Sequence, residues 1–142
     1  MRLFIANFKW VMVICGLLTC TMLLGLFSPD QWLHDNLGES LTTGPENLAI
    51  RGWMALIGLM GIMLIYGGFH LPVRNYSLVI AGTNKIILIV LASVYGKAYL
   101  SFGLGTAVVA DAVMVVLFAL YLLMARQNKQ TAAGQQPLYV SK

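Results

Sequence analysis

The segment SLVIAGTNKIILIVLASVY, residues 77–95, decides the fold class, because it is long, apolar and interrupted by a single charge at Lys85. A helix needs about 20 mostly apolar residues to cross a hydrocarbon core of roughly 30 Å. None of these residues follows the period-two alternation of a membrane β-strand. The chain contains three further stretches of the same kind: Trp10–Phe27, Trp53–Leu71 and Gly103–Ala125. The sequence therefore predicts four membrane-spanning helices.

The composition of the whole chain supports this class. Of 142 residues, 59% are hydrophobic and 10% are charged, whereas soluble domains are about a quarter charged. A water-soluble globule and a disordered chain are excluded, because both need many more polar side chains. The same composition excludes nucleic-acid binding as the explanation of the net charge of +4, so no nucleic-acid partner is expected. We predict a four-helix transmembrane domain over residues 1–126, in contact with the lipid bilayer, and a polar cytoplasmic tail over 127–142.

Basic residues in short connections set the orientation of a membrane protein, because they favour the cytoplasmic side. Phe27-Ser28-Pro29 offers no small-x-small cleavage site after the first span, so we expect this helix to be retained. With a cytoplasmic N-terminus, the inside surfaces hold six basic residues and the outside surfaces hold two: Arg2, Lys9, Arg74, Arg126, Lys129 and Lys142 against Arg51 and Lys97. The first connection then carries four of the five acids to the outside. We expect a multi-pass protein of a bacterial-type inner (plasma) membrane, with both termini cytoplasmic.

The first connection, Ser28–Ile50, is the one long enough to hold structure. Ser28 and Pro29 suit a helix start and Gly38 suits a helix end, which predicts a short helix lying at the outer interface. A second start signal, Gly44-Pro45-Glu46, begins the next helix before the bilayer. The other connections are short turns, Pro72–Tyr76 inside and Gly96–Phe102 outside. The fold class is therefore an all-α membrane protein, an antiparallel bundle of four transmembrane helices with a short interfacial helix.

Two charged residues, Lys85 and Asp111, lie within the spans on the small-residue faces of the third and fourth helices. Counted from Ser77 and Gly103, each lies about 12 Å inside its own boundary, so their levels in a core of roughly 30 Å differ by about 6 Å. An unpaired charge there costs about 2.5–3.5 kcal/mol. We therefore predict an ion pair, with Asn84 or a water completing its hydrogen bonds. The pair either fixes helix register or titrates in a cavity and couples to a ligand.

Other polar residues are weighed in the same way. Arg51 is predicted at the outer boundary, bonded to carbonyls or acids of the first connection such as Glu46. His34 and His70 are separated by the whole bilayer and cannot share a metal or a haem iron.

Glycines on the second helix make it thin on several sides, which predicts packing against more than one neighbour. No catalytic constellation, metal cluster or cofactor motif is found, so we expect no catalytic residues, no metal and no cofactor.

The run Glu46-Asn47-Leu48-Ala49-Ile50-Arg51-Gly52, a Gly-rich span after it and Asn84-Lys85 in the next helix resemble the DoxX-like group of small four-helix membrane proteins, over roughly residues 46–125. The resemblance implies a four-helix fold and, for some members, a subunit linked to membrane quinone or thiol oxidation. Arg51 and Gly52 correspond residue by residue. The acid stands five residues before Arg51, and Trp53-Met54 replaces the family's aromatic-Gly pair.

The sequence leaves two hypotheses of function open. In the first, the chain is a non-catalytic accessory or assembly subunit, or a self-associating scaffold, with another membrane protein or a second copy as its partner. In the second, it is a proton- or small-molecule-coupled transporter or binding protein that uses Lys85 and Asp111, because ionisable residues at depth are functional candidates. The DoxX-like resemblance adds a quinone-linked redox subunit. The sequence favours a protein that is not an enzyme.

Overall fold

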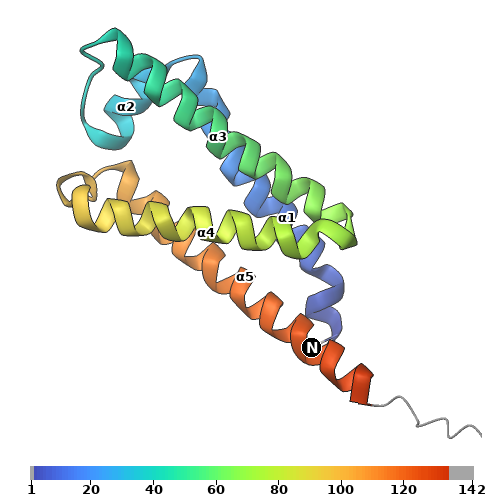
Figure 1. Ribbon diagram of the computed structural model, residues 1–142. Helices are drawn as coiled ribbons and strands as arrows, with labels where there is room; N and C mark the ends of the chain where they lie inside the picture. Colours follow the sequence, from blue (N-terminus) through green and yellow to red (C-terminus); the bar gives the residue numbers. More distant parts are fainter. Residues whose placement is uncertain (1, 135–142) are drawn as a thin grey trace, which may run out of the picture.

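The computed structural model describes residues 2–134, and that part of the chain is all-helical (Figure 1). The elements are α1 (Arg2–Cys20), the 3-10 turn η1 (Thr21–Leu26), α2 (Pro29–Leu37), α3 (Gly44–Phe69), α4 (Leu71–Tyr95), η2 (Lys97–Tyr99) and α5 (Gly103–Gly134). Four stretches are long and apolar enough to cross a membrane: Asn7–Leu26, Gly44–Phe69, Leu71–Tyr95 and Gly103–Gln127. The predicted antiparallel bundle of four long apolar helices, with a short helix between the first two, is confirmed.

The start and end signals in the first connection act as predicted, except for the side-chain cap at Ser28. Pro29 stands in the first turn of α2, and Gly38 ends the helix with a φ of 71°, a left-handed conformation that favours glycine. Thr43 caps α3 through a capping box, in which its hydroxyl accepts from the Glu46 amide and the Glu46 carboxylate accepts from the Thr43 amide. Ser28 occupies the N-cap of α2 without a side-chain hydrogen bond.

The predicted turn at Pro72–Tyr76 is wrong. Only His70 separates the end of α3 at Phe69 from the start of α4 at Leu71. Pro72 lies in the first turn of α4, where its missing amide hydrogen removes no intrahelical bond, so it begins the helix instead of breaking it. The following residues, Arg74 included, therefore belong to α4.

The last helix is longer than predicted. α5 continues from Gly103 to Gly134, past the predicted end of the span at Ala125. The first part of the predicted polar tail, residues 127–134, is thus helical, and residues 135–142 lie outside the described part of the chain.

The helices pack in the order α1, α3, α4, α5. The contact between α1 and α3 is close: a Cβ atom added at Gly61 would lie 2.7 Å from the Gly16 carbonyl oxygen. On the other side of α3, a Cβ at Gly67 would lie 2.5 Å from the Ser77 hydroxyl oxygen of α4. Small residues let membrane helices approach in this way. The prediction that the Gly-rich helix packs against more than one neighbour is confirmed.

The helices enclose a buried core at one end of the bundle and diverge at the other. The buried core lies toward the end that holds the two termini, and there the Phe8 and Tyr121 rings stack with centroids 4.1 Å apart. The core residues are Phe8, Met12, Cys15, Leu64, Leu78, Ala81, Met114, Phe118 and Tyr121. Toward α2, the α1–α3 pair and the α4–α5 pair diverge (Figure 1). We call these two regions the terminal end and the α2 end.

Candidate functional site

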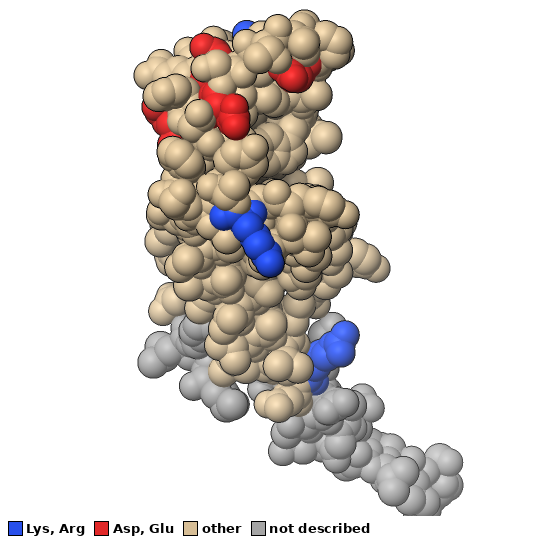
Figure 2. All heavy atoms as spheres, turned by 90° about the vertical axis from the view of Figure 1, so that its left-hand side faces the viewer, with Lys and Arg blue, Asp and Glu red and all other residues tan. Residues whose placement is uncertain are grey.

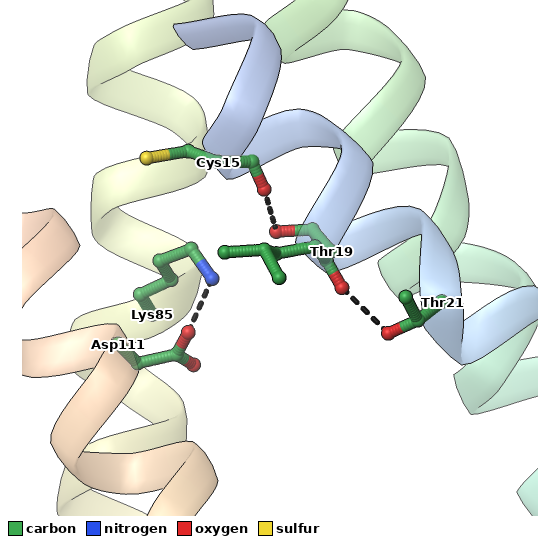
Figure 3. Close-up of polar contacts among 6 residues, drawn as sticks. Cys15, Thr19, Thr21, Lys85 and Asp111 are labelled. Carbon is green, nitrogen blue, oxygen red and sulfur yellow. Dashed lines mark hydrogen bonds and ion pairs between the residues drawn. The ribbon is translucent and has the colours of Figure 1, made fainter. Parts of the chain in front are cut away.

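The structure brings Lys85 of α4 and Asp111 of α5 together. The Lys85 ammonium donates a hydrogen bond to Asp111 Oδ1, and the two side chains are 7% and 13% exposed (Figure 3). Counted from the ends of α4 and α5 that are joined by η2, the two residues lie at levels that differ by about 3 Å. Lys85 lies about 15 Å along α4 from Tyr95, and Asp111 lies about 12 Å along α5 from Gly103.

Asn84, the predicted supporting residue, does not complete this pair. Its side chain is half-buried and makes no hydrogen bond with Lys85, Asp111 or any other residue that the structure describes. The helical step of about 100° per residue turns it away from the face that carries Lys85.

A cavity of about 500 Å³ lies directly beside the ion pair. Its walls come from α1 and η1 on one side and from α5 on the other, with α3 and α4 behind them. The residues that line it include Leu18, Thr19, Thr21, Met22, Ile57, Lys85, Leu88, Leu104, Thr106, Ala107, Ala110, Asp111 and Met114. The small residues of α5 leave this space open. The pair therefore forms the polar floor of an otherwise largely apolar chamber.

Two threonines in the wall of the chamber, Thr19 and Thr21, donate their hydroxyl hydrogens within their own helical turns. Thr19 Oγ1 donates to the Cys15 carbonyl oxygen at 2.8 Å, and Thr21 Oγ1 donates to the Leu18 carbonyl oxygen at 2.6 Å (Figure 3). Such bonds to the preceding helical turn let a hydroxyl lie among apolar groups. Lys85 and Asp111 are consequently the charged groups among the described residues that line the cavity.

The α2 helix borders the cavity at the α2 end of the bundle. Trp32 and Asn36 of α2 line the space together with Trp53 of α3, and the two indoles meet edge to face with centroids 5.5 Å apart. Asn36 packs directly on Gly103, where a side chain on α5 would not fit. The Phe102 ring lies against Gly38, so α2 is seated on the first turn of α5. The sequence analysis did not predict that α2 lines the cavity and packs on α5, because no pattern within residues 29–37 indicates which helix they contact.

Arg51 connects the start of α3 to the end of the first span. Its Nε donates to Asn47 Oδ1 at 2.6 Å and its Nη1 donates to the Leu26 carbonyl oxygen. The carbonyl partner Leu26 lies at the end of the first span and not in the predicted first connection, and the suggested partner Glu46 is wrong. The Glu46 carboxylate accepts instead from the amides of Thr42 and Thr43, at 3.0 and 3.1 Å, since the third position of a helix is the one closest to the N-cap amide.

Arg74 is a buried charge that the sequence analysis assigned to a turn. Its side chain lies in α4, and the residue is 6% exposed. Nε and Nη2 donate to the carbonyl oxygens of Gly67 and Gly68, at 3.3 and 2.6 Å, and Nη1 donates to the Tyr121 hydroxyl at 3.4 Å. The guanidinium thus binds the unpaired carbonyls at the negative end of α3. The sequence signal that could have indicated this role is Pro72, because a proline is favoured in the first turn of a helix and would place Arg74 in that turn.

The two histidines lie apart, as predicted: His34 belongs to α2 and His70 joins α3 to α4. Within residues 2–134, no three side chains of His, Cys, Asp or Glu are placed to hold a metal ion. In Figure 2, which faces the left-hand side of Figure 1, acidic side chains gather at the top over α2 and its neighbours. The acids of this region are Asp30, Asp35, Glu39 and Glu46.

Comparison with known proteins adds no relative to this description. No family model, curated protein or solved structure matches the chain. The resemblance to the DoxX-like group therefore stays a prediction, and the site is interpreted from its own geometry.

Proposed function

We propose that this small four-span membrane protein binds a small, largely apolar molecule inside its bundle, with Lys85 and Asp111 as the polar anchor. The observation that supports this proposal is the position of the ion pair, at the floor of a chamber of about 500 Å³. Cavities that hold small molecules measure about 300–1,000 Å³, with mostly apolar walls and a few placed polar groups.

The contrast between the two ends of the bundle favours binding over a purely structural pair. Protein interiors are close-packed, with few voids larger than a water molecule. The terminal end follows that rule, since Met12, Leu64 and Phe118 are at most 2% exposed. If the Lys85–Asp111 pair only fixed helix register, close packing around it would be expected as well. The chamber leaves it instead beside open space.

The accessory-subunit and scaffold hypothesis has weaker support. Its sequence grounds are the absence of a catalytic constellation, the small size of the chain and the Gly-rich second helix. The structure uses the glycines of that helix within the chain itself, Gly61 against α1 and Gly67 against α4. The outward faces of the spans carry large apolar side chains typical of lipid contact, among them Leu17, Ile62, Val90 and Val116.

The basic residues support a placement of both termini in the cytoplasm of a bacterial-type cell. In that orientation, the α2 end faces the outside of the cell.

Tryptophan fluorescence tests the binding proposal. The chain has three tryptophans, and the variant Trp10→Phe keeps only Trp32 and Trp53, which both line the cavity. Bromine quenches an indole on contact. In nanodiscs of unbrominated lipid, 11-bromoundecan-1-ol is expected to quench this variant along a saturating curve.

A filled chamber is the control. Adding Ala107→Leu to the Trp10→Phe background places a larger side chain in the cavity wall and is expected to abolish saturation. The matched change Ala119→Leu, at an exposed position of the same helix, is expected to leave the curve unchanged. Quenching that rises linearly with probe concentration and is equal in all three proteins would refute binding in the cavity.

A further inference from the structure

The ion pair has hydrogen-bonding capacity that the protein does not use. An ammonium has three N–H donors, and Lys85 directs one of them to Asp111 Oδ1. The second carboxylate oxygen, Oδ2, has no partner among the described residues, and no side-chain nitrogen or oxygen of that part of the chain is both enclosed and unpaired. Oδ2 therefore keeps exposed surface, and its residue lines the cavity. The floor offers a donor and an acceptor side by side.

The charge of the floor restricts what it can bind. Lys85 and Asp111 neutralise each other, so a ligand head with a net charge would bring an unpaired charge into an apolar chamber, which is strongly unfavourable. A head that only accepts leaves Oδ2 unpaired, and one that only donates leaves the ammonium hydrogens unpaired. An uncharged head that carries a donor next to an acceptor satisfies both.

The shape of the chamber restricts the rest of the ligand. The lining residues of α5 run from Gly103 to Met114, a distance of about 16 Å along the helix. A volume of about 500 Å³ spread over that length gives a cross-section of about 30 Å², which suits one extended hydrocarbon chain. Leu18, Met22 and Leu88 supply apolar contacts along it.

On the basis of the proposed function, we infer that the ligand is an uncharged single-chain amphiphile whose head both donates and accepts hydrogen bonds, such as an alcohol or a primary amide. Its head lies at Lys85 and Asp111, and its chain extends toward Trp32 and Trp53 at the α2 end. Lys85 and Asp111 then select the head group, while the apolar walls hold the chain.

A series of probes with one chain and different heads tests this inference in the Trp10→Phe protein. The series contains 11-bromoundecan-1-ol, 11-bromoundecanamide, methyl 11-bromoundecanoate, 1-bromoundecane and 11-bromoundecyltrimethylammonium. The alcohol and the amide are expected to reach half-saturation at a concentration in the membrane at least about tenfold lower than the other three, because each adds a hydrogen bond to a charged group. Equal half-saturation for all five heads, or a preference for the cation, would overturn the inference.

The outcomes separate the inference from the proposed function. Saturable quenching without head preference leaves cavity binding standing and removes only the head-group selectivity. Absence of saturation for every probe removes the proposed function itself. The double variant Lys85→Met, Asp111→Leu gives the chamber an apolar floor and is expected to erase the tenfold preference. Because the head series is measured on the native pair, the test does not depend on whether this double variant folds.

Discussion

The contact between α1 and α3 makes a prediction that can be worked out from distances. In the variant Gly61→Ala, the new Cβ atom would lie 2.7 Å from the Gly16 carbonyl oxygen and 2.8 Å from the Cys20 amide nitrogen. Both are backbone atoms, so α1 as a whole must move away. Overpacking of this kind costs about 1–3 kcal/mol, and the upper value applies because no flexible side chain can yield. The gain in helix propensity from glycine to alanine returns about 1 kcal/mol. The variant is expected to lose about 2 kcal/mol of unfolding free energy.

Gly52→Ala is the matched control on the same helix. Nothing lies within 4 Å of a Cβ atom there, so this variant is expected to gain up to about 1 kcal/mol from helix propensity alone. Both variants are measured by reversible unfolding in mixed micelles with increasing dodecyl sulfate, followed by circular dichroism. The expected difference between them is about 3 kcal/mol. Equal stability of Gly61→Ala and Gly52→Ala would refute the close approach of α1 and α3.

Three further predictions concern the charged residues and the orientation. Lys85→Asp and Asp111→Lys are each expected to lower the unfolding free energy by about 3–5 kcal/mol, since each leaves a buried charge unpaired, and the double variant is expected to recover most of it; no recovery would contradict a direct pair. Arg74→Met is expected to cost about 2 kcal/mol or more, because the carbonyls of Gly67 and Gly68 lose a charged donor, whereas the exposed Arg51→Met costs less than about 1 kcal/mol; equal melting temperatures would argue against the Arg74 cap. A C-terminal green fluorescent protein fusion is expected to fluoresce and an alkaline phosphatase fusion to be inactive, and the opposite pattern would reverse the orientation.

The features that could be predicted from the sequence depend on helical periodicity and length. The spans follow from runs of apolar residues, and the meeting of Lys85 with Asp111 follows from small-residue faces on two neighbouring helices. Gly38 marks a helix end because few other residues adopt its positive φ. In each case, the information lies in the sequence of one helix or of two helices joined by a short connection.

The features that could not be predicted depend on where helices pass one another. Pro72 is compatible both with a turn and with a first helical turn, and only the observed start of α4 at Leu71 decides between them. The role of Arg74 follows from that start. The chamber is a space left by Ala107 and Ala110 opposite Leu18 and Met22, and no property of any one segment encodes the distance between α5 and α1.

The short link at His70 has a mechanical consequence for the chamber. α3 and α4 are tied by one residue and by the Arg74 guanidinium, and α1 packs closely on α3 at Gly61, so these three helices are coupled directly to one another. α5 is attached to them at three levels: by the stack of Phe8 on Tyr121, by the Lys85–Asp111 pair and by α2 at Gly103. Widening the chamber by moving α5 away from α1 therefore requires the Lys85–Asp111 hydrogen bond to break or α2 to separate from Gly103.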